Sequence, residues 1–231
     1  MLHTSDCHLD RVDGGPAQRA FEAMVDAAIE LDVDLVLIAG DPFDHWPDRR
    51  RCARLDRVPV RPGRPARGAT PRQPRRLDGD SVYHRFGLRS RCSNVLFLGA
   101  PDGRAIEVPG TDVIVWGRAM TDHVPAFRPL LSPPRVDGRW LIVAGHGLAV
   151  PSAEAGSGRS SPIVPEDLDT LDADYVALGH LHVHEVLRTE PLPAYSGATA
   201  RSRSGMPGCV LVRLIPGQLA SLARHALRVS A

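Results

Sequence analysis

The chain has 231 residues, which is enough for one sizeable domain with a buried core, and its apolar fraction of 43% is ordinary for a globular protein. It contains no run of about 20 apolar residues and no basic and apolar signal region at its N-terminus, so we expect no membrane span and no secretion. The four cysteines (Cys7, Cys52, Cys92 and Cys209) form no C-x-x-C pair. That spacing favours neither a zinc knuckle nor a disulfide framework and indicates a cytoplasmic location.

The charge is concentrated in one segment. The chain has 28 basic residues, all of them arginine, and a net charge of +1. Residues 48–76 hold 11 arginines against two aspartates, a net charge of +9, so the remainder of the chain carries −8. This segment also holds five prolines and has no apolar periodicity. We therefore expect it to be irregular, without helix or strand.

The first elements are predicted from their apolar patterns. Residues 2–6 are expected to form a short strand that runs into a loop. Residues 16–31 place apolar side chains at helical spacing, with Pro16 suited to the first turn. Residues 34–41, "DLVLIAGD", form a continuous apolar run ended by glycine and aspartate, which is typical of a strand buried on both faces. Strand, helix and strand at this length predict a βαβ unit and a parallel pair.

Strand patterns return after the arginine-rich segment. They cover residues 94–99, 105–108, 112–117, 140–147, 174–180, 185–188, 194–197 and 209–215. A Pro-Gly turn at residues 216–217 is expected to fold the last segment back as a hairpin. Many short strands with few helices predict an α/β fold in which two sheets pack together under helices. We expect residues 1–231 to form a single domain.

Carboxylates and imidazoles stand where four of these strands end. The residues are Asp6 and His8, Asp41 and Asp44, His146, and His180 and His182. Strand carboxyl ends meet at one crevice of an α/β sheet, so these side chains are expected to converge. Any one of them alone is more often structural, since a lone histidine is usually a core residue and G-D-x-x-D also occurs at turns. Four such groups together favour a site for two divalent ions, which share a carboxylate and generate hydroxide for attack on a phosphoryl centre.

The ordered motifs resemble those of the calcineurin-like metallophosphoesterase superfamily. The superfamily signature is D-x-H, G-D-x-x-D, G-N-H-[DE], a lone His and G-H-x-H; this chain has "DCH", "GDPFD", His146 and "GHLH" in that order. The stretches "HTSDCHLD", "GDPFDH" and "YSGATARS" most resemble the DNA-repair exonuclease branch. The resemblance reaches about Val212, excluding the arginine-rich segment. It implies a four-layer αββα sandwich of two mixed sheets flanked by helices, with the metal site at strand carboxyl ends.

The resemblance also implies roles for individual residues. Asp6, His8 and His182 would bind one ion, Asp41 would bridge, and His146 and His180 would bind the other. Asp44 would orient a ligand or the loop, so that Asp41, Asp44 and His146 form the catalytic set. The ions would be two Mn²⁺, with Fe or Zn as alternatives. The implied activity is hydrolysis of phosphodiesters, nuclease-like and with DNA as a candidate substrate, by a metal-bound hydroxide. His45, Trp46 and His184 receive no role.

One motif of the superfamily is missing. No Asn-His pair occurs in the chain, although G-N-H-[DE] would supply a ligand and a general acid. In GC-rich codons, Pro-Gly-Asn-His-Asp reads CCC GGC AAC CAC GAC. Reading from the last base of the proline codon gives CGG CAA CCA CGA, or Arg-Gln-Pro-Arg, which stands at residues 72–75. We therefore interpret residues 48–76 as a frameshifted stretch bounded by two compensating insertions or deletions, and expect an impaired hydrolase.

The arginine-rich segment has a second interpretation. A block of like charge is often an interaction segment, and arginines bind phosphate backbones. The alternative function is therefore an inactive phosphoesterase-fold protein that binds nucleic acid through residues 48–76. Steep weakening of that binding as salt rises would distinguish it from the hydrolase.

Overall fold

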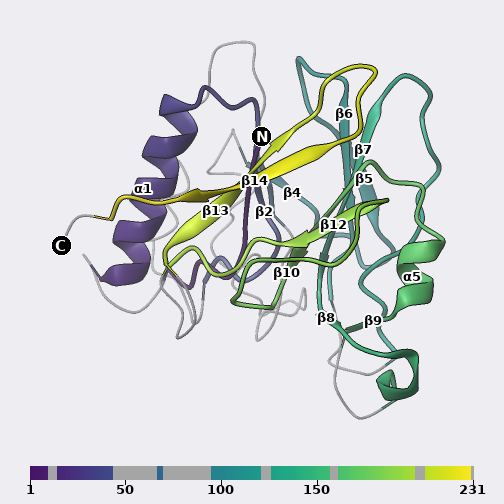
Figure 1. Cartoon of the computed structure of the whole chain (residues 1–231). Helices are drawn as coiled ribbons and strands as arrows, with labels where there is room; N and C mark the ends of the chain where they lie inside the picture. The colour runs from purple at the N-terminus through teal and green to yellow at the C-terminus, as the bar shows by residue number, and fades with distance from the viewer. Residues whose placement is uncertain are drawn as a thin grey trace.

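Two six-stranded sheets make up most of the molecule (Figure 1). The computed structural model describes residues 1–9, 15–43, 67–69, 95–120, 126–156, 161–200 and 206–229. The first sheet has the order β14-β13-β1-β2-β3-β4 and the second the order β11-β12-β10-β7-β6-β5.

The elements have the following bounds. The strands of the first sheet are β1 (Leu2–Thr4), β2 (Val36–Ile38), β3 (Arg67–Ala69), β4 (Val95–Phe97), β13 (Gly208–Arg213) and β14 (Ser221–Ala226). Those of the second are β5 (Arg104–Glu107), β6 (Val113–Gly117), β7 (Trp140–His146), β10 (Tyr175–Gly179), β11 (Glu185–Val186) and β12 (Leu192–Tyr195). The remaining elements are α1 (Pro16–Glu30), α5 (Pro165–Asp169), η2 (Ser152–Glu154) and the small pair β8 (Leu148–Ala149) and β9 (Pro162–Ile163).

Alternation along the strands divides the core into layers. In β7, Ile142 and Ala144 face the first sheet, whereas Leu141 and Val143 face the side of α5. The first sheet follows the same rule: Leu37 of β2 packs between the sheets, and its neighbours on the strand pack toward α1. Successive side chains of a strand point to opposite faces, so each sheet buries both of its faces. The described chain is thus α1, two mixed sheets and α5 in four layers, which confirms the predicted αββα architecture.

Helix α1 covers the outer face of the first sheet (Figure 1). It begins at Pro16, whose missing N–H is harmless in the first turn, and it buries Phe21 and Met24 against β1 and β2. The spacing predicted this helix to within one residue. Ile29, expected on the apolar face, is 51% exposed and lies one residue before the end of the helix.

A buried polar pair links the two sheets between their hydrophobic layers. Nδ1 of His3 on β1 lies 2.7 Å from the hydroxyl of Tyr175 on β10, and both side chains are fully buried. Burial lowers the pKa of His3 to about 3, so the ring is neutral in the fold.

The strand directions place several strand ends at one edge of the sandwich. Strands β1 to β4 are parallel neighbours in the first sheet, and β6, β7, β10 and β12 are parallel in the second. The hairpin expected at residues 216–217 is present, since β13 and β14 pair antiparallel.

Part of the arginine-rich segment belongs to the first sheet. Residues 67–69 form β3 between β2 and β4, so the expectation of no helix or strand over residues 48–76 is wrong for these three residues. Sheet pairing is a non-local interaction, which the composition of a segment does not report. The remainder of 48–76 lies outside the described residues. Within the described part of the chain, no helix has the length and apolar character needed to cross a membrane.

Candidate metal centre

Asp6 lies at the centre of the candidate site, just beyond the carboxyl end of β1. The residue is 1% exposed, and its Oδ2 accepts a hydrogen bond of 3.0 Å from the backbone N–H of His180. Burial acts to raise the pKa of Asp6, but the hydrogen bond from His182 and the nearby His146 outweigh it and hold the pKa well below its usual range. Asp6 is therefore a carboxylate at neutral pH, although it is buried.

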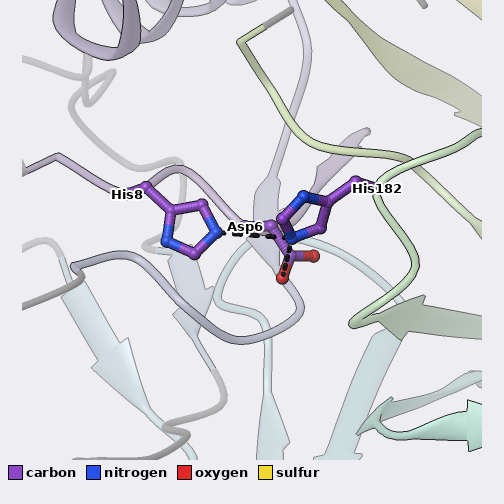
Figure 2. Close-up of side chains that lie close together, drawn as sticks. All are labelled: Asp6, His8 and His182. Carbon is purple, nitrogen blue, oxygen red and sulfur yellow. Dashed lines mark hydrogen bonds and ion pairs between the residues drawn. The ribbon is translucent and has the colours of Figure 1, made fainter. Parts of the chain in front are cut away.

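Two imidazoles, those of His8 and His182, lie beside this carboxylate and point toward each other (Figure 2). Nε2 of His182 lies 3.5 Å from Oδ1 of Asp6, and the Nε2 atoms of His8 and His182 lie 3.4 Å apart. His182 is 48% exposed, so this group of three opens to solvent on one side. Asp6, His8 and His182 offer one ligand atom each within the span of a single ion.

A second group of three shares Asp6 and lies deeper. It consists of Asp6, Asp41 and His146, all buried. Nδ1 of His146 lies 2.9 Å from the backbone oxygen of Ala39. Since a carbonyl only accepts, Nδ1 must carry the proton, and in the neutral ring Nε2 is then the nitrogen that bears the lone pair. This is the tautomer that metal coordination through Nε2 requires.

Two glycines, Gly40 and Gly179, leave the space that the His146 ring occupies. A Cβ on Gly40 would lie 2.1 Å from Nδ1 of His146, and a Cβ on Gly179 would lie 2.8 Å from the same atom. Both glycines come directly before a candidate ligand, Asp41 and His180 respectively. The Gly-Asp and Gly-His pairs of the motifs are therefore packing requirements of the imidazole as well as turns of the chain.

The backbone is held in an unfavourable conformation at four candidate ligands. Asp6, His8, Asp41 and His180 have φ of 49°, 49°, 46° and 102°. Among the described residues that are not glycine, only Asp32 and Ser161 also have positive φ. Such conformations cost L residues free energy and gather at functional sites where the surrounding structure enforces them.

The structure brings together five of the seven residues predicted at strand ends: Asp6, His8, Asp41, His146 and His182. His180 is in neither group of three, but its ring lies at 5.4 Å from that of His146 between centroids. Asp44, with His45 and Trp46, lies outside the described residues. All the roles assigned to these residues stay predictions, including that of Asp41 as the bridge. In the described geometry Asp6 is the carboxylate common to both groups.

Sequence reasoning gave no role to several residues that hold the site. His184, which received no role, lies in the loop after β10 and is half-buried, and its Nδ1 lies 2.8 Å from the backbone oxygen of Tyr195. Tyr195 and Thr199 hydrogen-bond to the loops that carry the candidate ligands. The one signal for them in the sequence is the small polar stretch "YSGAT" at the end of a predicted strand.

The donor set fits the chemistry of borderline divalent ions. Two carboxylates and three imidazoles in two groups, joined by Asp6, suit Mn²⁺, Fe²⁺ or Zn²⁺. An αββα sandwich with such a group of candidate ligands at its strand ends is typical of metal-dependent phosphoesterases. The family model described as calcineurin-like phosphoesterase matches residues 1–184, and the chain belongs to this family.

A search of characterised proteins adds one relative. The chain is 30% identical over 219 residues to the DNA double-strand break repair protein Mre11 of Aeropyrum pernix, an alignment that covers 85% of this chain. The chain spans about half the length of that relative, 52%. The match supports the exonuclease-like branch of the phosphoesterases to which the sequence motifs pointed.

Proposed function

We propose that this chain is a dinuclear-metal phosphoesterase that hydrolyses phosphodiesters, with nucleic-acid ends as its class of substrate. The observation that carries the proposal is the buried carboxylate of Asp6, shared by two groups of ligands at one sheet edge. The name of the Aeropyrum pernix relative, a DNA repair protein, supports DNA as the substrate.

The residues of this chain have distinct tasks in the proposal. Asp6, His8 and His182 hold one ion, and Asp6, Asp41 and His146 hold the other, with His180 beside it. The ions, which we expect to be Mn²⁺, supply a nucleophile at neutral pH and neutralise charge on the phosphate. Asp6 remains ionised in its buried place, and Ala39 holds His146 in the tautomer that leaves Nε2 for the ion. The solvent-facing side of His182 leaves room for a large substrate.

We further propose that the chain is impaired as a catalyst because the G-N-H-[DE] motif is absent. Support comes from β3, which is parallel to β2 and therefore ends at the same edge at which Asp41 follows β2. The sequence "TPRQPRR" follows β3, at the place in the order of motifs where the superfamily has G-N-H-[DE]. Loss of a general acid typically costs about 10²–10⁴-fold in rate.

The experiment is hydrolysis of bis(4-nitrophenyl) phosphate with Mn²⁺. The parent chain is compared with Asp6→Asn, with Asp26→Asn on the exposed face of α1 as the matched control, and with a chain in which residues 72–75 are replaced by Gly-Asn-His-Asp. We expect weak activity in the parent and in Asp26→Asn, none in Asp6→Asn, and a gain of roughly 10²-fold or more in the repaired chain. The Asp6→Asn substitution is also made in the repaired chain. Equal rates for the repaired chain with and without this substitution would contradict the proposal.

Two further expectations belong to this proposal. We propose that residues 1–231 act as one domain in the cytoplasm; Cys7 and Cys209 are buried free thiols, which supports a reducing location. The alternative, a nucleic-acid-binding protein that uses residues 48–76, rests on residues that are mostly outside the described part and stays a prediction.

A further inference from the structure

Residues 195–199, Tyr-Ser-Gly-Ala-Thr, connect the loops that carry the candidate ligands. This segment begins at the end of β12 and holds no carboxylate, imidazole or thiol. It nevertheless hydrogen-bonds to three loops: the one after β1, the one after β7 and the one after β10. Its side chains that make these bonds are buried.

Thr199 is the centre of the contacts with the loop after β1. Its Oγ1 lies 3.2 Å from the backbone oxygen of Ser5, 2.7 Å from Oγ1 of Thr4 and 3.2 Å from Sγ of Cys7. Because a carbonyl only accepts, the Thr199 hydroxyl donates to Ser5, and its two lone pairs accept from Thr4 and Cys7. This single hydroxyl therefore makes three hydrogen bonds, to Thr4, Ser5 and Cys7, the residues on either side of the candidate ligand Asp6.

Tyr195 makes the equivalent contacts with the loop after β7. Its hydroxyl donates to the backbone oxygen of Gly147 at 2.9 Å and accepts from the N–H of Ala149 at 2.8 Å. Gly147 follows His146 directly, and Ala149 lies two residues further along the chain. The Tyr195 side chain therefore fixes the backbone on the carboxyl side of that ligand.

The backbone of the same segment holds the loop after β10. The N–H of Ala198 donates to the oxygen of His182 at 3.3 Å, and His184 donates through Nδ1 to the oxygen of Tyr195 at 2.8 Å. Gly197 approaches this loop closely, since a Cβ there would lie 3.0 Å from the backbone N of His184. A side chain at position 197 would push the loop of His182 away.

The positive φ of Asp6 and His8 explains why such support is needed. A left-handed conformation is unfavourable for an L residue, so the loop would relax to another conformation if it were free. Hydrogen bonds from outside the loop must therefore hold it. The bonds of Thr199 reach the loop from the segment that follows β12 and supply this support.

We propose that Thr199 and Tyr195 are positioning residues of the metal centre: Thr199 sets the loop of Asp6 and His8, and Tyr195 sets the loop of His146. Neither touches an ion or substrate; both act through the backbone of the ligands. The inference rests on the proposed metal site. If the two residues served the core alone, their loss would lower stability and leave metal binding unchanged.

The test is titration of the metal-free chain with Co²⁺, whose visible absorption reports the ligand geometry, together with thermal unfolding without metal. The variants are Thr199→Val, which keeps the shape and removes the hydroxyl, Thr199→Ser, which restores it, and Tyr195→Phe. The matched controls are Thr170→Val, whose hydroxyl contacts only carbonyls of its own helix, and Tyr175→Phe, which loses a buried hydroxyl bonded to His3.

We expect Thr199→Val and Tyr195→Phe to bind Co²⁺ roughly 10–100-fold more weakly, with altered spectra, as for other groups that orient ligands. Thr199→Ser should bind as the parent does, and both controls should keep parent affinity and spectrum even where they unfold earlier. Parent-like affinity in both Thr199→Val and Tyr195→Phe would overturn the inference, and if Thr199→Val does not fold, Tyr195→Phe decides alone. A parent chain that binds no Co²⁺ would overturn the metal site itself, and the inference with it.

Discussion

Replacing Gly40 by alanine is expected to disturb the metal centre through the His146 ring. The new Cβ would lie 2.1 Å from Nδ1 of His146 and 2.7 Å from Cγ, whereas favourable contacts between such atoms lie at about 3.5–4.0 Å. The ring or the strand end must therefore move by about 1 Å or more. Either movement breaks the 2.9 Å hydrogen bond from Nδ1 to Ala39 and redirects Nε2.

The expected loss of stability in Gly40→Ala has two parts. Gly40 has φ of 92°, and a left-handed conformation costs an L residue about 1–2 kcal/mol. The lost hydrogen bond adds about 0.5–1.5 kcal/mol. The free energy of unfolding should fall by about 1.5–3.5 kcal/mol. Divalent-metal affinity should fall by roughly 10–100-fold, because His146 loses the group that orients it.

The control for this variant is Gly217→Ala. Gly217 also has positive φ, 77°, but a Cβ at this position would meet no atom within 4 Å, so alanine there adds the backbone cost alone. Urea unfolding and Mn²⁺ titration by calorimetry are measured on both variants. Gly40→Ala binding Mn²⁺ as tightly as Gly217→Ala would refute the argument that the glycine makes room for the histidine.

Three other predictions concern His3, the bound ions and Arg128. First, the neutral His3 is favoured in the fold, its pKa lowered to about 3 against 6.5 in the unfolded chain, so its contribution to stability is complete above pH 6.5 and is lost as pH falls toward 3. Urea unfolding with EDTA should show about 2 kcal/mol less stability at pH 5 than at pH 7. A His3→Gln variant whose unfolding free energy changes with pH as steeply as that of the parent would refute this. Second, Mn²⁺ at about 100 times its dissociation constant should stabilise the chain by about 2.7 kcal/mol in thermal scans; Asp6→Asn should remove the effect, and its persistence there would place the ions elsewhere. Third, Arg128 donates to both carboxylate oxygens of Asp167 at 2.6–2.7 Å. Arg128→Ala should therefore lower the free energy of unfolding by about 1–2 kcal/mol without changing Mn²⁺ affinity. Urea unfolding and calorimetry check these two results.

The local spacing of apolar residues was sufficient to predict most of the fold. The continuous apolar run before Gly40 and the helical spacing after Pro16 predicted β2 and α1, because burial on two faces or on one stripe leaves a periodic trace in the sequence. The ends of the predicted strands also placed His8, Asp41, His146 and His182 near Asp6, since parallel strands end at a common edge.

The spacing of apolar residues did not predict contacts between segments that are far apart in the sequence. Arg67 to Ala69 read as part of an irregular segment, yet these residues pair with strands on both sides. The hydroxyls of Thr4 and Thr199 meet across 195 residues of sequence, and a small polar side chain gives no periodic signal of a buried partner. The same reason hid Tyr195, whose apolar ring fits a strand pattern while its hydroxyl reaches the loop of His146.

The most direct measurement is anomalous diffraction at the manganese edge from a crystal of the chain grown with Mn²⁺. We expect two peaks on either side of the Asp6 carboxylate, about 3.5–4 Å apart. The peak beside His8 and His182 should have the higher occupancy, because the chain lacks the Asn-His motif that completes the shell of the other ion. Density for ions only at surface carboxylates, with none beside Asp6, would contradict the central claim.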